Sequence, residues 1–263
     1  SSNPVIYTNL GSAFKEQGDF AAAIVSFQTA ISIDPDLAEA HYNLAVSLQS
    51  LGQQELAIAS YLKTLVFSND KYDAHVNLGV AYRELRQYDK SVRSLRNAIE
   101  LDPKNVAGHL SLGMTLAAMG RHTAALESYG HALEIDQKSV PVLVSQANVH
   151  KDLGKFDAAF SSIQRALQAD PDYVLAHNNL LFIQNYVGHQ TAERLLADAK
   201  RFGAVVTRQA RPFKDHPNSL DPHKVLKVGF VSGDLGEHPV GYFLESVLSP
   251  LQSQSSGRLE IFA

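Results

Sequence analysis

The stretch AEAHYNLAVSLQSLGQQELAIASYLKTLVFSND, residues 38–70, decides the fold of this 263-residue chain. It contains two segments with apolar residues at helical spacing, separated by a turn around Gly52. A break follows the second segment, and equivalent breaks recur every 34 residues, at Pro35, Asn69, Pro103, Gln137 and Pro171. Because proline cannot continue a helix, the sequence predicts a series of helix pairs that end near these positions.

The units defined by these breaks agree place by place. They begin at Pro4, Ala38, Tyr72, Val106, Val140 and Val174. Small residues fill the eighth place at Gly11, Ala45, Gly79 and Gly113, and the twentieth place at Ala23, Ala57, Ser91, Ala125 and Ala159. The twenty-seventh place is also small, and glycine recurs in the turns at Gly18, Gly52, Gly120 and Gly154. We therefore expect the two helices of each unit to approach closely at the small residues.

This pattern resembles the tetratricopeptide repeat, which residues 38–70 match nearly place for place. The resemblance covers five full repeats, residues 4–173, with local departures at Gln137 and Gln146. It implies a mainly α fold in which the repeats stack into a right-handed superhelix. The first helix of each repeat would then line a concave surface that binds a partner.

Polar residues recur at the sixth place of the units, on the helices expected to line that surface. They are Asn9, Asn43, Asn77, Ser111, Ser145 and Asn179. An Asn amide has two donors and an acceptor, so this ladder predicts a groove that holds the backbone of an extended peptide or protein segment. The alternative is that these amides bond to a neighbouring helix of the stack.

Four histidines share the fourth place of their units: His41, His75, His109 and His177. They lie on different repeats, too far apart to share one ion at metal-ligand bond lengths of about 2 Å. We interpret them as packing residues and predict no metal site.

Composition excludes several classes of function. The formal net charge is −4 and the Lys and Arg residues are scattered, which argues against a nucleic-acid partner. The absence of cysteine excludes disulfides and a Cys nucleophile. No apolar run approaches the roughly 18 residues of a membrane span, so we predict no membrane partner. The lack of cysteine fits a reducing compartment, and we expect a cytoplasmic location.

The pattern changes after the fifth repeat. Residues 174–210 are predicted to form a partial sixth repeat and a capping helix, with Thr191 as its N-cap. The apolar stripe predicted for that helix consists of Leu195, Leu196, Ala199 and Phe202. The proline-rich residues 211–223 are predicted to be a linker.

Residues 224–263 predict a different fold class. KVLKVGFVS, residues 224–232, is typical of a strand, a helix is expected from about Pro239, and RLEIFA, residues 258–263, is typical of a second strand. This strand-helix-strand unit would open a parallel α/β sheet, which is expected to be incomplete at the end of the chain. Its unpaired strand edges would allow self-association with a second copy.

This last region resembles the O-linked N-acetylglucosamine transferases and SPINDLY-like glycosyltransferases of the GT-B, Rossmann-like fold. The resemblance covers residues 176–263 and is carried mainly by Lys227, Val228, Gly229, Phe230, Val231, Ser232, Asp234, His238 and Pro239. It implies inverting transfer of a sugar from a UDP donor to Ser or Thr of a protein, without an obligatory metal. It also implies that His238 is a catalytic base or positioning group; the alternative is a histidine that only caps its loop.

Two hypotheses follow for the whole chain. In the first, it is the acceptor-recognising array and first catalytic segment of an O-GlcNAc-transferase-like enzyme. Because the family's UDP contacts come mainly from a second Rossmann-like domain, this chain would hold no cofactor and would be inactive alone. In the second, it is a stand-alone scaffold that mediates protein-protein interactions.

Overall fold

The computed structural model describes residues 3–188, 190–209, 226–229 and 259–262, and the chain divides into two compact units. The first unit is Ser1–Gln209 and the second is Ala210–Ala263. None of the helices in the described residues combines the length and the apolar character needed to cross a bilayer.

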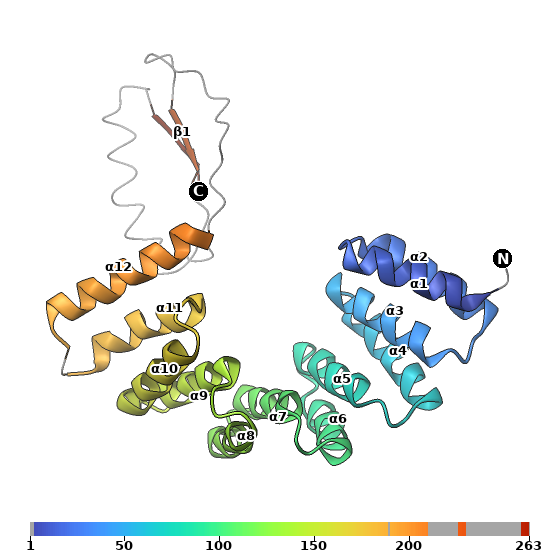
Figure 1. Cartoon of the computed structure of the whole chain (residues 1–263), viewed down its shortest axis with the longest axis horizontal. Helices are drawn as coiled ribbons and strands as arrows, with labels where there is room; N and C mark the ends of the chain where they lie inside the picture. The colour runs from blue at the N-terminus through green and yellow to red at the C-terminus, as the bar shows by residue number, and fades with distance from the viewer. Residues whose placement is uncertain (1–2, 189, 210–225, 230–258, 263) are drawn as a thin grey trace. The chain divides into compact units, whose positions relative to one another are not determined.

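The described part of the first unit contains twelve α-helices (Figure 1). They are α1 (Pro4–Glu16), α2 (Phe20–Ile33), α3 (Ala38–Ser50), α4 (Gln54–Phe67), α5 (Tyr72–Glu84), α6 (Tyr88–Leu101), α7 (Val106–Ala118), α8 (His122–Ile135), α9 (Val140–Asp152), α10 (Phe156–Ala169), α11 (Val174–Ile183) and α12 (Ala192–Gln209). A short 3₁₀ helix, η1 (Gln184–Tyr186), follows α11. The odd-numbered helices from α1 to α11 begin at the six residues where the sequence units begin, so the predicted helix pairs are confirmed.

Small residues are required at the eighth place because a large side chain of the second helix packs directly against it. A Cβ added at Gly11 would lie 2.6 Å from the Phe27 ring, and one added at Gly79 would lie 2.5 Å from Leu95. The five residues at the twentieth place are fully or almost fully buried between the paired helices. The prediction of close helix approach at small residues is therefore confirmed.

The turn inside each repeat needs a left-handed backbone. The four turn glycines have positive φ: 80° at Gly18, 74° at Gly52, 73° at Gly120 and 69° at Gly154. Glycine adopts this conformation without a steric penalty, since it has no Cβ. The third repeat places Arg86 at the same turn position, with φ of 56°, so its turn has the same geometry at a higher conformational cost.

The two helices of a repeat occupy different sides of the stack. Consecutive odd-numbered helices from α1 to α11 contact one another, whereas consecutive even-numbered helices show no comparable contact in the described residues. Each even-numbered helix from α2 to α10 packs instead between its own partner and the next odd-numbered helix. The odd-numbered helices therefore form the inner face of a curved stack and the even-numbered helices form its outer face, as α5 to α8 show in Figure 1.

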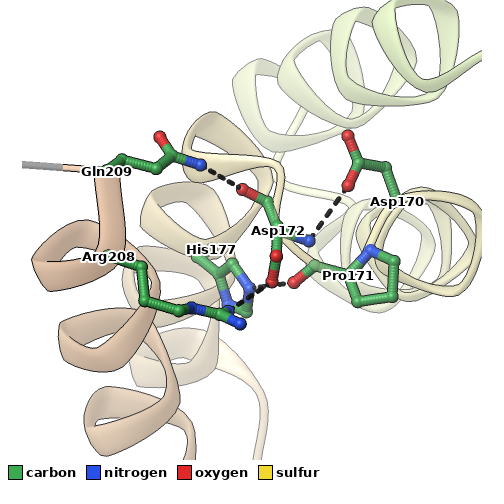
Figure 2. Close-up of polar contacts among 6 residues, drawn as sticks. All are labelled: Asp170, Pro171, Asp172, His177, Arg208 and Gln209. Atoms are coloured by element: carbon green, nitrogen blue, oxygen red, sulfur yellow. Dashed lines mark hydrogen bonds and ion pairs between the residues drawn. The ribbon is translucent and has the colours of Figure 1, made fainter.

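Helix α12 closes the stack against α11, and polar contacts fix its end (Figure 2). Its N-cap is Thr191, as predicted, and the Thr191 Oγ1 accepts a hydrogen bond from the Arg194 amide at 3.3 Å. At the other end, Arg208 Nη2 donates to Asp172 Oδ1 at 2.6 Å, and Gln209 Nε2 donates to the Asp172 carbonyl at 3.2 Å. These bonds join α12 to the turn that precedes α11.

The apolar stripe predicted for α12 is wrong in part. Leu196 and Ala199 are exposed. The buried side instead includes Val205, and Asp198 Oδ2 accepts a hydrogen bond of 2.6 Å from the buried Gln184. A polar pair thus lies where the sequence pattern suggested an apolar contact, so the helix is rotated from the predicted orientation.

The second unit contains two short strands in its described residues. Strand β1 (Leu226–Gly229) pairs in parallel with β2 (Leu259–Phe262), and Leu226 is opposite Leu259. Both strands lie within the segments expected to be extended. The linker predicted at 211–223, the helix expected from Pro239 and the candidate His238 lie outside the described residues.

Candidate functional site

The predicted groove residues lie on the inner helices but differ in exposure. Asn9 is exposed, Asn43 and Ser111 are buried, and Asn77, Ser145 and Asn179 are partly buried. The sixth place is thus turned toward the contact between repeats at least as much as toward solvent.

Three of these amides form hydrogen bonds to the preceding repeat. Asn43 Oδ1 accepts from Lys15 Nζ at 2.7 Å, and Asn77 Nδ2 donates to the Tyr42 hydroxyl at 3.1 Å. In the last repeat, Asn179 Nδ2 donates to Asn148 Oδ1, also at 3.1 Å. The amide ladder therefore joins adjacent repeats, and it keeps further hydrogen-bonding groups, such as the Asn148 Nδ2, on the inner face.

A tyrosine cluster surrounds Asn77. The Tyr42 and Tyr61 rings lie 6.0 Å apart, and the Tyr61 hydroxyl donates to Gln49 Oε1 at 2.8 Å. Burial raises the pKa of both tyrosines, because the phenolate is poorly solvated there. Both hydroxyls are therefore neutral hydrogen-bonding groups in this part of the inner face at ordinary pH.

A small cavity opens on the inner face between the fourth and fifth repeats. Its volume is about 190 Å³. This inner pocket is lined by Met114, Ala117, Tyr129, Ser145, Asn148, Val149 and Asp152. Met114 is 38% exposed although it is a large apolar residue. The pocket thus combines an apolar wall with the polar groups of Ser145, Asn148 and Asp152, a mixture suited to one side chain of a bound peptide.

Tyr129 forms the floor of the inner pocket from the outer helix α8. It is almost fully buried, and burial raises its pKa to about 12, with a hydrogen bond to Ser145 and the nearby Arg83 acting in the opposite direction. The hydroxyl is therefore protonated at neutral pH. It fixes one of the predicted groove residues, Ser145.

Arg83 supplies a positive charge next to Tyr129. Its side chain is partly buried, and its Nη1 is buried without a hydrogen-bond partner among the described residues. Burial lowers the pKa of Arg83, while Glu84 and Tyr129 act to raise it. A guanidinium group forms strong, often bidentate hydrogen bonds with carboxylates.

The four fourth-place histidines have the same packing role. Each ring Nε2 donates to a backbone carbonyl of the preceding turn: at Pro35 (2.8 Å), Asn69 (3.1 Å), Pro103 (2.9 Å) and Pro171 (2.7 Å). The His41 ring stacks on Phe67 at 5.7 Å, and the His177 ring lies 6.2 Å from Phe202 of α12. The packing interpretation is confirmed.

Sequence reasoning predicted Ser145 but missed other residues of the inner pocket, among them Met114, Asn148 and Tyr129. Met114 and Asn148 share the ninth place of adjacent repeats. An apolar residue such as Met114 is unusual at this exposed place, and it could have indicated a binding surface. No signal marked Tyr129, because it belongs to an outer helix and reaches the inner face only through packing.

Comparison with known proteins identifies the repeats. Two family models are described as "Tetratricopeptide repeat": one matches residues 72–105, and the other matches residues 107–139 and 140–173. A third, described as "TPR repeat", matches residues 11–52. Similar folds occur in solved structures. One concerns Pseudomonas aeruginosa pilF, with TM-score 0.63 and 21% identity, covering 82% of this chain and 93% of that chain. YrrB, "a TPR protein with an unusual peptide-binding site", has TM-score 0.55 and 20% identity, covering 67% of this chain and 91% of that chain.

Curated relatives match a shorter stretch. The protein named "Probable UDP-N-acetylglucosamine--peptide N-acetylglucosaminyltransferase SPINDLY" from Petunia hybrida is 32% identical over 80 residues. Its Arabidopsis thaliana counterpart is 30% identical over the same length. In both cases the matched stretch is 30% of this chain and only 9% of the relative.

Proposed function

Because the chain belongs to the tetratricopeptide-repeat family, we propose that its inner face binds an extended peptide segment of a partner protein. The observation that carries this proposal is the inner pocket, which residues of two successive inner helices build together with Tyr129. Such arrays present an extended concave surface for recognition. The likeness to YrrB, whose structure is described as having a peptide-binding site, is consistent with this function.

The inner face offers complementary contacts for such a segment. The exposed Asn9 and the remaining amide groups of the ladder would bond to the peptide backbone. The inner pocket would hold an apolar side chain against Met114 and Ala117. A carboxylate of the peptide would pair with the guanidinium group of the partly buried Arg83.

Selection of random displayed peptides on the wild-type chain tests this proposal. We expect the selected peptides to bind Met114→Lys about tenfold more weakly, since a charged side chain would enter an apolar wall. Arg83→Met should weaken only peptides that carry a carboxylate. Leu101→Lys is the matched control, because Leu101 is a similarly exposed apolar residue of the outer helix α6. Equal binding to all three variants would contradict an inner-face site.

We further propose that the array recruits acceptor proteins for an O-GlcNAc-transferase-like enzyme that transfers a sugar from a UDP donor to Ser or Thr. Two observations support this: the similarity to SPINDLY proteins and the transferase-like sequence around His238. The parallel pairing of β1 and β2 fits the start of an α/β domain. His238 would act there as the base or positioning group.

A transfer assay separates this enzyme function from a stand-alone scaffold. The chain would be extended along its reading frame and supplied with a labelled UDP-sugar and a selected Ser-containing peptide. We expect transfer by the extended form, loss of transfer in His238→Ala, and no transfer by residues 1–263 alone. A reading frame that closes after Ala263, or an extended form that binds no UDP in calorimetry, would favour the scaffold.

A further inference from the structure

A second cavity opens on the outer face between α4 and α6, two consecutive even-numbered helices that do not pack against each other. Its volume is about 480 Å³. This outer groove is lined by Leu62, Leu65, His75, Leu78, Tyr82, Lys90, Arg93, Ser94 and Asn97. Helix α5 supplies the floor, so the groove lies on the opposite side of that helix from the inner face.

The α4 wall of the outer groove is unusually apolar for a solvent-facing surface. Leu62 is 45% exposed, and Val66, one helical turn further along α4, is 72% exposed. The corresponding places of the other four full repeats carry no large apolar residue: Gln28, Arg96, Gly130 and Gln164, and Ser32, Glu100, Glu134 and Gln168. The apolar surface is therefore a property of the second repeat and not of the repeat pattern.

The α6 wall is cationic. Arg93 is exposed and has no hydrogen bond or ion pair among the described residues. Lys90 Nζ donates to Gln87 Oε1 at 2.8 Å and lies 5.4 Å from the centre of the Tyr82 ring, but no described carboxylate neutralises it. The groove thus has an apolar wall facing a wall with two positive charges that lack an acidic partner.

Its size and chemistry define the occupant. A cavity of this volume is comparable to ordinary ligand pockets, so it accommodates a few side chains of a segment but not a folded domain. Apolar side chains would cover Leu62 and Leu65, and carboxylates would form charge-assisted hydrogen bonds with Arg93 and Lys90. A basic segment would meet uncompensated repulsion from the α6 wall.

We propose that the outer groove is a second protein-binding site, which takes an acidic amphipathic segment of a partner. The segment places an apolar side chain between Leu62 and Leu65 and a carboxylate on Arg93. Because this site lies on the outer face, it is independent of peptide binding on the inner face. The array can hold two partner segments at the same time.

Fluorescence anisotropy with a labelled peptide of sequence DELLEDLLDELL tests the proposal. We expect saturable binding to the wild-type chain and about tenfold weaker binding to Arg93→Glu, which replaces attraction by repulsion. Leu62→Gln should weaken binding about fivefold, since it removes an apolar contact. A peptide with Lys at every acidic position should not bind.

Two control variants on the same helices locate the effect. Arg96→Glu makes the same charge change on α6 outside the groove, and Leu56→Gln makes the same apolar-to-polar change on α4 outside it. Both should bind the acidic peptide as the wild type does. Absence of binding to the wild type, equal effects of Arg93→Glu and Arg96→Glu, or equal binding of the acidic and basic peptides would overturn the proposal.

Discussion

The inner and outer faces of the array are built from the same repeat, yet the polar groups on the two faces have different environments. On the inner face, adjacent helices touch and side chains bond across repeats, as Asn77 does with Tyr42. On the outer face, adjacent helices do not close, and Arg93 and Leu62 remain open to solvent. Residues of the inner face therefore affect both stability and binding, whereas those of the outer face affect mainly binding.

Curvature is the physical cause of this difference. In a curved stack the inner circumference is shorter, so side chains of successive inner helices must pack against each other. The outer helices are spread apart, and a cleft forms wherever the side chains do not fill the space. The following substitutions test this contrast, from the largest expected effect to the smallest.

Gly113→Val should destabilise the array by about 3 kcal/mol. Any Cβ at Gly113 would collide with the buried Tyr129 ring, and a branched side chain cannot avoid it. Urea unfolding followed by circular dichroism measures the change. Gly130→Ala on the outer helix α8 is the control. Nothing lies near the added Cβ, and alanine favours a helix more than glycine does, so the free energy of unfolding should rise by about 0.5 kcal/mol. Equal losses at both glycines would contradict the close packing of α7 against α8 at Gly113.

High pH should destabilise the array through Tyr129. Burial raises its pKa to about 12, above the ordinary value near 10, so the folded state keeps a proton that the unfolded state releases. The resulting stabilisation is fully present below about pH 10 and is lost as the pH rises toward 12. Its total is about 3 kcal/mol, since each unit of pKa difference corresponds to about 1.4 kcal/mol. Urea unfolding at pH 9 and pH 11.5 should show a smaller pH-dependent loss in Tyr129→Phe than in the wild type; identical losses would exclude this tyrosine as a cause.

Asn77→Ala should cost about 1 kcal/mol, because the Tyr42 hydroxyl loses its partner across the repeat boundary. Asn97→Ala on the outer face is the matched change, since Asn97 is exposed and has no hydrogen bond among the described residues. Its effect should stay within about 0.5 kcal/mol. Thermal or urea unfolding compares the stabilities of the two variants. Double-mutant cycles with Tyr42→Phe should give a coupling energy between Tyr42 and Asn77 and none between Tyr42 and Asn97.

Arg86→Gly should stabilise the array by about 0.5 kcal/mol. Arg86 occupies the left-handed turn position that glycine fills in the other four full repeats, and the removed strain slightly exceeds the entropy that glycine adds to the unfolded chain. The reverse kind of change, Gly52→Ala, should lower the free energy of unfolding by about 1 kcal/mol. Unfolding midpoints of both variants check the sign, and a loss in Arg86→Gly would show that the arginine makes a compensating contact.

Sequence periodicity predicted the helix pairs and their small interface residues, because a close approach between two helices permits few side chains at a fixed spacing. It oriented α12 only in part: of the expected stripe, Leu195 and Phe202 are partly buried, but Leu196 and Ala199 are exposed. There the decisive contact is the hydrogen bond between Asp198 and Gln184, and a polar pair gives no periodic apolar signal. The residues predicted to line a groove lie on the odd-numbered helices, but their bonds to preceding repeats depend on how neighbouring units pack.

By itself, the sequence determined the number and place of the repeats, since each glycine turn, small residue and helix break acts locally. Only the tertiary structure decided which surfaces stay open. The inner pocket needs Tyr129 of an outer helix beside Ser145 of the next inner helix, and the outer groove needs Leu62 and Arg93 from different repeats. Such sites arise from the separation and curvature of stacked units, and no single stretch of sequence contains that information.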